Sequence, residues 1–332
     1  MNSVERFRRV LSFQQVDRLP VIEWAPWWDK TIERWRGEGL PAALKGDGEI
    51  RDYLGQDRFR HFWIGPRASG CPQPASHGAP LIQSLEDYER LKSFLYPSPP
   101  FDPDWVRPWA EPHESGRTAV WITLEGFFWF PRGLFGIQPH FYAFYDQPDL
   151  MNRINEDLLA FNLRALEQFC AILRPEFMTF AEDMSYNRGP MLSKAMFDEF
   201  LAPFYRRIVP RIRELGIVPM IDSDGDVTAM IPWLEEIGIE GILPLERQAG
   251  VDVAKIRARH PRFRMIGGFD KMVMKLGPQA MRREFERLLP VMRTLGFIPG
   301  VDHQTPPDVS LDAYRQYVSL LREYCERAGE RA

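Results

Sequence analysis

Two aspartates and one histidine form the clearest candidate site in the sequence. Asp222 and Asp224 stand two residues apart in the segment IDSDGDV, and His303 stands in DHQTPPDVS near the other end of the chain. Carboxylates at alternate positions of a strand share one face, and an imidazole beside them completes three ligands for a divalent metal. Three protein ligands leave a position open for a substrate. These residue types therefore predict a metal site, with zinc as one candidate ion.

Further acidic residues follow other short apolar segments, so the predicted site is larger than three residues. They are Glu23, Glu125, Glu182, Asp183, Glu246, Asp270 and Asp302. Taken singly, each carboxylate could cap a helix or pair with a neighbouring cation. If all of them lay close together, their negative charges would repel one another unless arginines, shared protons or a metal balanced those charges. We expect Glu182 or Glu246 to act as a further ligand or as the acid, and Tyr186 to position the substrate.

Aromatic and basic residues follow the same segment ends. Trp24, Trp27 and Trp129 are predicted to form flat, apolar walls for a substrate. Arg188 and Arg247 are the candidate cations for binding an acidic group on it.

The hydrophobic pattern predicts the scaffold that would bring these distant residues together. Short apolar runs with little alternation are separated by segments of helical spacing, as in a parallel sheet covered by helices. Eight strands and their helices favour an α/β fold of the (β/α)8 barrel class, whose sites lie at the carboxyl ends of the strands. We predict the strands at 19–25, 58–66, 118–126, 175–184, 217–225, 239–246, 262–270 and 297–307.

Two segments stand outside this repeat. Residues 2–14 predict an extra helix before the barrel. Residues 67–117 are rich in proline and form a long insertion after the second strand, which we expect to pack over the barrel mouth; a surface loop without a role is the alternative. With this insertion included, we predict a single domain over 1–332.

The composition narrows the class of protein. The chain has 332 residues, of which 45% are hydrophobic and 27% are charged, as in a globular protein. Its net charge of −4 gives no reason to expect a nucleic acid or an anionic membrane as a partner. There is no apolar signal segment and no membrane-spanning run, so we expect a cytoplasmic protein. The three cysteines are far apart and predict neither a disulfide framework nor a thiolate zinc site.

Six segments spread over nearly the whole chain form a recognisable set of motifs. They are ERFRRVLSFQQVDRLPV, SYNRGPMLSKAMFDEFLAPFYRRI, IDSDGDV, GILPLE, GGFD and DHQTPPDVS. As a set they resemble the uroporphyrinogen decarboxylase superfamily. The resemblance implies a (β/α)8 barrel with its site in the mouth, and it places Tyr186 and His303 at site positions. The superfamily includes the decarboxylase and zinc-dependent methyltransferases that exchange methyl groups with corrinoid proteins.

The chain departs from both branches of this superfamily. WAPWWDK stands where the decarboxylase has an arginine-rich R-Q-A-G-R loop, and WIGPRASG stands where it has a catalytic aspartate. The methyltransferases have an H-x-C-G pair of zinc ligands and a later cysteine, where this chain has Asp222, Asp224 and His303. Oxygen and nitrogen ligands suit activation of an ether oxygen better than activation of a thiol.

We therefore expect a metal-assisted, corrinoid-dependent methyltransferase. It would move a methyl group from a small O-methyl substrate, such as a methoxylated aromatic, to the cobalt of a corrinoid carried by a partner protein, which becomes a methyl-corrinoid. The alternative is a decarboxylase of a porphyrinogen or another acidic substrate, which would use no metal and would need Arg67, Arg188 and Arg247 in the mouth. A second alternative is a non-catalytic member that binds a tetrapyrrole or a corrinoid. The oligomeric state stays open, with a homodimer as one candidate.

Overall fold

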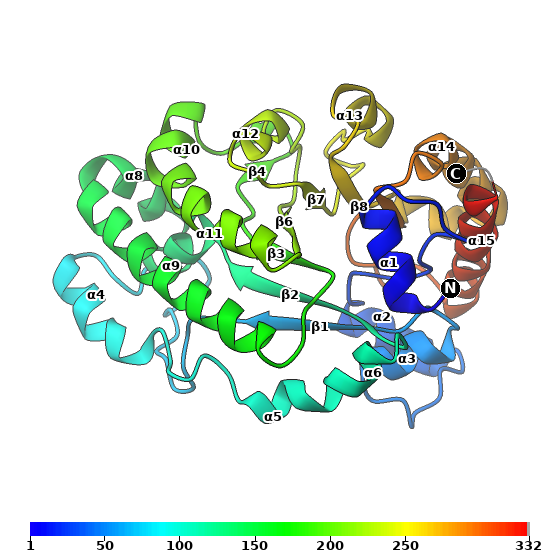
Figure 1. The fold of residues 1–332 in the computed structure, drawn as a ribbon, viewed down its shortest axis with the longest axis horizontal. Helices are drawn as coiled ribbons and strands as arrows, with labels where there is room; N and C mark the ends of the chain where they lie inside the picture. The colour runs from blue at the N-terminus through cyan, green and yellow to red at the C-terminus, as the bar shows by residue number, and fades with distance from the viewer. Residues whose placement is uncertain (331–332) are drawn as a thin grey trace.

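A curled, seven-stranded parallel sheet is the centre of the computed structural model, which describes residues 1–330 (Figure 1). Its strands are hydrogen-bonded in chain order, and each neighbouring pair is parallel. The α/β barrel class predicted from the sequence is confirmed. The strands are β1 (Phe59–Ile64), β2 (Ala119–Glu125), β3 (Phe177–Ala181), β6 (Val218–Asp222), β7 (Gly241–Leu243), β8 (Arg264–Phe269) and β9 (Phe297–Val301), and a separate hairpin consists of β4 (Ser185–Tyr186) and β5 (Gly189–Pro190).

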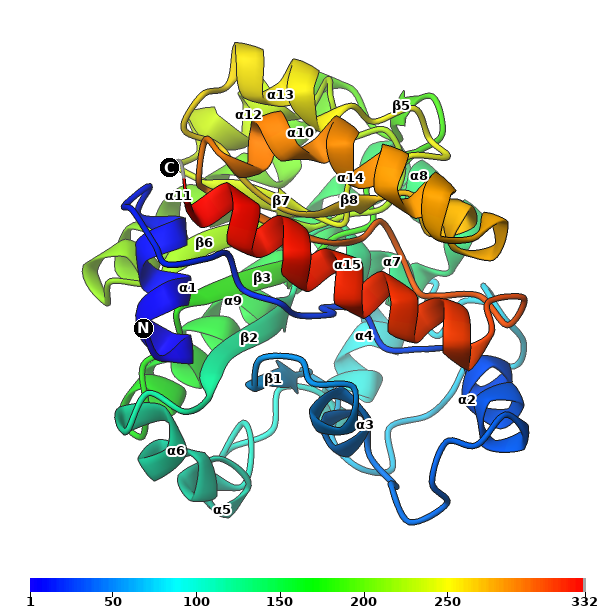
Figure 2. The same ribbon diagram turned by 90° about the vertical axis from the view of Figure 1, so that its right-hand side faces the viewer.

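Helices follow the strands and pack on the outside of the sheet (Figures 1 and 2). The first six are α1 (Ser3–Leu11), α2 (Asp29–Gly37), α3 (Asp47–Tyr53), α4 (Leu85–Leu91), α5 (Pro103–Val106) and α6 (Ala110–Glu114). The others are α7 (Trp129–Phe135), α8 (Ile137–Asp146), α9 (Pro148–Cys170), α10 (Lys194–Phe200), α11 (Ala202–Glu214), α12 (Ile231–Glu236), α13 (Val253–Arg259), α14 (Pro278–Met292) and α15 (Leu311–Gly329). Short 3-10 helices are η1 (Lys92–Phe94), η2 (Arg107–Trp109) and η3 (Lys271–Leu276).

The chain between β5 and β6 forms two consecutive helices. The break falls at Leu201, between α10 and α11, and Pro203 stands in the first turn of α11. Proline has no N–H to donate to the preceding turn, which favours a new helix start at this point.

The first predicted strand, 19–25, is not part of the hydrogen-bonded sheet. Its neighbours are nevertheless those of a first barrel strand: the Asp57 N–H donates to the Val21 carbonyl at 2.8 Å, and Trp24 Nε1 donates to the Val301 carbonyl at 2.7 Å. The segment therefore lies in the gap between β1 and β9. Pro20 cannot donate to a ladder, and the Val21 N–H is taken by the Asp57 carboxylate at 2.9 Å, so no ladder forms.

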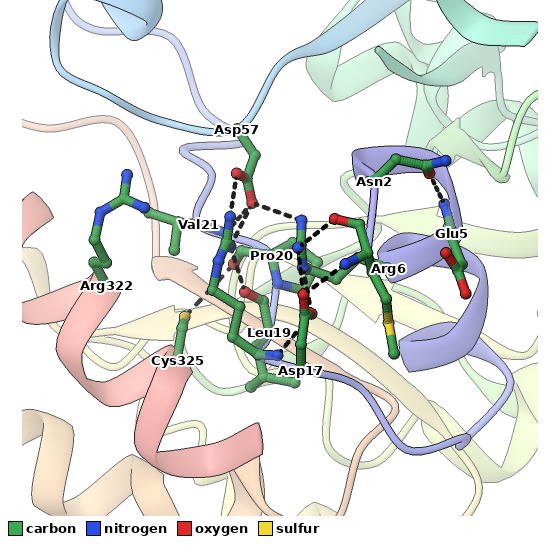
Figure 3. A network of polar contacts seen from close by, with 12 residues as sticks. Asn2, Glu5, Arg6, Asp17, Leu19, Pro20, Val21, Asp57, Arg322 and Cys325 are labelled. Atoms are coloured by element: carbon green, nitrogen blue, oxygen red, sulfur yellow. Dashed lines mark hydrogen bonds and ion pairs between the residues drawn. The ribbon is translucent and has the colours of Figure 1, made fainter. Parts of the chain in front are cut away.

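A network of charged residues fixes the start of this segment (Figure 3). Arg18 donates to both carboxylate oxygens of Asp57, at 2.7 and 2.6 Å, and Arg6 donates to Asp17 at 2.9 and 2.8 Å. Burial opposes ionisation of Asp57, but the hydrogen bonds from Arg18 and the Val21 N–H outweigh it and hold the pKa of Asp57 below its usual value. Figure 2 shows the segment running beside α15, where the Leu19 N–H donates to the Cys325 carbonyl at 3.2 Å.

Only the first part of the insertion lies at the carboxyl ends of the strands. There the Leu81 N–H donates to the Leu134 carbonyl at 2.8 Å, and the Ile137 N–H donates to the Gly78 carbonyl at 3.1 Å. Helices α4, α5 and α6 then return along the outside of β1 toward its amino end (Figure 1). The expectation that all of 67–117 covers the mouth is therefore too broad, because the chain must return to the amino end before it starts the next parallel strand.

Among residues 1–330, no helix combines the length and the apolar character needed to cross a membrane.

Candidate functional site

Three side chains from different strand ends meet at the mouth of the barrel. Asp224 follows β6, Glu246 follows β7 and His303 follows β9. One ligand atom of each lies within 4.8 Å of those of the other two, and His303 Nε2 is 3.4 Å from Asp224 Oδ2. Two carboxylates and an imidazole at this spacing fit a divalent metal, and their chemistry suits zinc or a harder ion. We call these three residues the triad.

Asp222, the other predicted ligand, does not join the triad. It is the last residue of β6, paired with Ala181 and Leu243 on the two sides. Burial raises the pKa of Asp222 well above its usual value, and the charges of Asp183 and Asp224 raise it further. Asp222 therefore favours its protonated form beneath the triad.

A tight turn orients two of the triad residues. The Gly225 N–H donates to Glu246 Oε2 at 2.9 Å, and Gly225 has φ +84°, a conformation that L-residues rarely adopt. A Cβ at this position would lie 2.7 Å from the backbone of Tyr186. The backbone of the β4–β5 hairpin therefore packs directly on the turn, and Tyr186 in this hairpin is 49% exposed.

Asp183, one of the acidic residues that the sequence placed at strand ends, also belongs to the acidic mouth. Its carboxylate accepts the Asp224 N–H at 3.2 Å, and its φ is +32°. Burial raises the pKa of Asp183 to about 6, with a further contribution from Asp224. The one sequence signal for this residue is its place directly after Glu182 at a strand end.

Glu182 uses its carboxylate to hold a loop. It is fully buried and accepts the N–H groups of Phe127, Phe128 and Trp129 at 2.8, 2.8 and 3.1 Å, and it also accepts the hydroxyl of Tyr205. Burial raises the pKa of Glu182 to about 7, although the hydrogen bonds from Tyr205 and the three N–H groups lower it. Glu182 therefore holds the backbone of the loop that carries Trp129.

The three predicted tryptophans have different environments. Trp129 lines a cavity of about 380 Å³ beside the mouth. Trp24 is half-buried in the gap between β1 and β9. Trp27 is only 5% exposed and packs edge-on against Trp35 and Tyr314, at centroid distances of 5.5 and 5.6 Å. Trp27 is thus part of the core and is not a substrate wall.

The predicted cations do not enter the triad. Arg188 is exposed on the turn between β4 and β5, and Arg247 donates to the Val251 carbonyl of its own loop at 2.6 Å. Lys271, which the sequence did not single out, lies 3.2 Å from the fully buried Asp302 and balances its charge. Sequence spacing could not show which carboxylate each cation would meet.

Comparisons with known proteins agree with this architecture. The family model for uroporphyrinogen decarboxylase (URO-D) matches residues 143–324, more than half of the chain. A solved structure described as a methyltransferase from Methanosarcina mazei is similar over 98% of this chain and 99% of its own, with a TM-score of 0.65 and 14% identity. At that identity the likeness shows a shared fold. No curated protein matches the chain.

The matched region contains β3 to β9, and with them the strand ends that carry all three triad residues. The chain therefore belongs to the uroporphyrinogen decarboxylase family.

Proposed function

We propose that this protein is a metal-assisted, corrinoid-dependent methyltransferase that acts on a small O-methyl substrate. The observation that carries the proposal is the triad, whose oxygen and nitrogen atoms lie within 4.8 Å of one another at the barrel mouth. The fold shared with the archaeal methyltransferase supports it. Decarboxylation of a porphyrinogen needs no metal, so it offers no use for this ligand set.

Asp224, Glu246 and His303 would hold a divalent ion. When bound, the ion would supply Lewis-acid stabilisation to the ether oxygen of the substrate. The methyl group would leave that oxygen for the cobalt of a reduced corrinoid on a partner protein, and the electron pair of the broken C–O bond would stay on the oxygen. Asp183 adjoins the triad, since its carboxylate accepts the Asp224 N–H at 3.2 Å, and it is the carboxyl group that would supply a proton to the departing oxygen.

The experiment combines metal analysis with a methyl-transfer assay. Protein purified without chelator should carry about one equivalent of a divalent metal, and free cob(I)alamin should gain a methyl group from a methoxyarene, as its absorbance spectrum reports. His303→Ala should lose both properties. His260→Ala is the matched control, because that imidazole pairs with Glu235 far from the triad, at 2.8 Å. Metal-free protein that transfers methyl groups at the full rate would refute the proposal.

A decarboxylase of an acidic substrate is the second candidate. Arg67 and Arg132 both line the cavity beside the mouth and favour it, because carboxylates need cationic partners. Release of carbon dioxide from a porphyrinogen by chelator-treated protein would select this function over methyl transfer.

A further inference from the structure

The cavity beside the mouth is enclosed by two parts of the chain that are distant in sequence. Its volume is about 380 Å³, within the usual range for small-molecule sites. One side is formed by the insertion, at 73–79, and the other by the start of α7 and the α7–α8 junction. Its chemically distinctive lining residues are Arg67, Glu125, Trp129, Phe130, Arg132 and Ile137.

Backbone contacts hold this cavity in shape. The insertion is joined to the α7–α8 junction by hydrogen bonds from Leu81 and Ile137, described above. Close contacts leave no space for side chains here: a Cβ on Gly136 would lie 2.6 Å from the Gly78 carbonyl oxygen, and a Cβ on Gly133 would lie 2.8 Å from Arg67 Nη2. The cavity is therefore formed before any ligand binds, which lowers the entropic cost of binding.

Two arginines in the cavity have no carboxylate partner. Among residues 1–330, the Arg132 side chain makes no hydrogen bond or ion pair, and its buried Nε is unsatisfied. Its guanidinium instead lies 4.9 Å from the centre of the Trp129 ring. Arg67 donates one bond, to the Gly133 carbonyl at 2.9 Å, and forms no ion pair within the described part of the chain. Both guanidinium groups therefore have N–H donors free for an anion.

The cavity combines these arginines with apolar walls and one acidic lining residue, Glu125. Trp129, Phe130 and Ile137 provide flat and aliphatic surface. Glu125 lines the cavity and accepts a hydrogen bond from Trp63 Nε1 at 3.1 Å; burial and, to a smaller extent, the charge of Asp183 raise its pKa. A ligand with one anionic end would thus place that end at the arginines and its neutral end toward the carboxylates.

We propose that this cavity selects a methoxylated aromatic acid, with Trp129 against the ring and with Arg132 and Arg67 on the carboxylate. The choice of a methoxy group rests on the proposed function, whereas the choice of an aromatic carboxylate rests on the cavity alone. A planar guanidinium binds a carboxylate through two parallel hydrogen bonds, which a neutral group of the same shape cannot accept.

Calorimetric binding to the full-length, chelator-treated chain tests this proposal without any turnover. The probes are 4-methoxybenzoate and its neutral analogue 4-methoxybenzamide. The acid should bind at least tenfold more tightly than the amide. Arg132→Met should weaken binding of the acid at least tenfold and leave the Kd of the amide within twofold, whereas Trp129→Ala should weaken both.

Arg206→Met is the matched control, because Arg206 is exposed on α11 and does not line the cavity; it should change neither Kd. Thermal unfolding checks that each variant is folded, and Arg67→Met provides a second test if Arg132→Met is not. Equal Kd values for acid and amide, or an acid Kd unchanged by both arginine variants, would overturn the proposal. Selective binding of the acid without methyl transfer would instead refute only the proposed function.

Discussion

Nε2 of His303 lies 3.4 Å from Oδ2 of Asp224, although the strands that precede them, β9 and β6, are not neighbours. Adjacent strands are spaced by about 4.8 Å, so three such steps across a flat sheet would separate these residues by roughly 14 Å. The curl of the sheet removes this separation. The candidate metal site therefore depends on the curvature of the sheet as well as on the residue types at the strand ends.

The two aspartates of IDSDGDV should differ in their effect on metal binding. Asp224→Asn should weaken zinc affinity at least tenfold, because Asp224 supplies an atom of the triad. Asp222→Asn should weaken it by less than threefold, because its carboxylate lies outside the triad and favours the protonated form. Competition with a chromogenic chelator measures both affinities. A larger loss in Asp222→Asn would restore the ligand set predicted from sequence.

The Gly225 turn should be sensitive to a single added carbon. In Gly225→Ala, strain at φ +84° and the 2.7 Å approach to the Tyr186 backbone should together lower the free energy of unfolding by about 2–3 kcal/mol. The displaced turn should also weaken metal binding through Glu246. Gly39→Ala separates the two effects, because Gly39 has φ +101° but open space around its Cβ position. It should cost about 1 kcal/mol and leave metal affinity unchanged.

Glu182 should matter for stability of the loop that carries Trp129. Glu182→Gln replaces an acceptor of four hydrogen bonds by an amide with its own buried N–H donors, and urea unfolding should show a loss of about 2–3 kcal/mol. Tyr205→Phe removes only one of those bonds and should cost about 1 kcal/mol. A Glu182→Gln variant with native stability but no turnover would instead support Glu182 as the catalytic acid.

Glu23 should give the folded protein a measurable pH dependence. Its carboxyl is fully buried near Tyr314 and Tyr317, and burial raises its pKa from 4.5 to about 8. Between pH 4.5 and about 8, Glu23 is therefore protonated in the folded state and ionised in the unfolded state. The stabilising effect of this proton is complete below pH 4.5 and is lost as the pH rises to about 8, by up to about 5 kcal/mol.

Glu23→Gln should flatten the curve of unfolding free energy against pH over this range. The stability of the variant relative to the wild type should therefore increase as the pH rises. Urea unfolding at four or five pH values measures the curve. Glu33→Gln, on the exposed side of α2, is the control and should follow the wild-type curve. Parallel curves for Glu23→Gln and the wild type would mean that Glu23 is ionised in the folded state.

The charged network at the start of the 19–25 segment should contribute to stability. Asp57→Asn removes the carboxylate that Arg18 contacts at 2.7 and 2.6 Å and leaves that guanidinium largely buried without a counter-ion. We expect a loss of about 2–3 kcal/mol in the free energy of unfolding. Asp52→Asn, at an exposed pair with Arg58, should cost less than 1 kcal/mol and serves as the control in the same urea titration.

The sequence by itself determined the barrel class, the positions of seven of the eight predicted strands and the identity of the residues at their carboxyl ends. It could do so because apolar runs buried on both faces and helical spacing are local patterns, and parallel strands align their carboxyl ends at one edge. The prolines beside 19–25 were also visible, but their effect depended on Asp57 taking the Val21 N–H.

Only the tertiary structure decided how each strand-end side chain is used. Glu246 joins the triad while Asp222, equally acidic and nearer in sequence to Asp224, does not. Glu182 binds backbone N–H groups, Trp27 packs in the core, and Arg132 faces a cavity without a partner. These outcomes depend on side-chain direction and on contacts between segments far apart in the chain, and spacing along one strand contains no information about either.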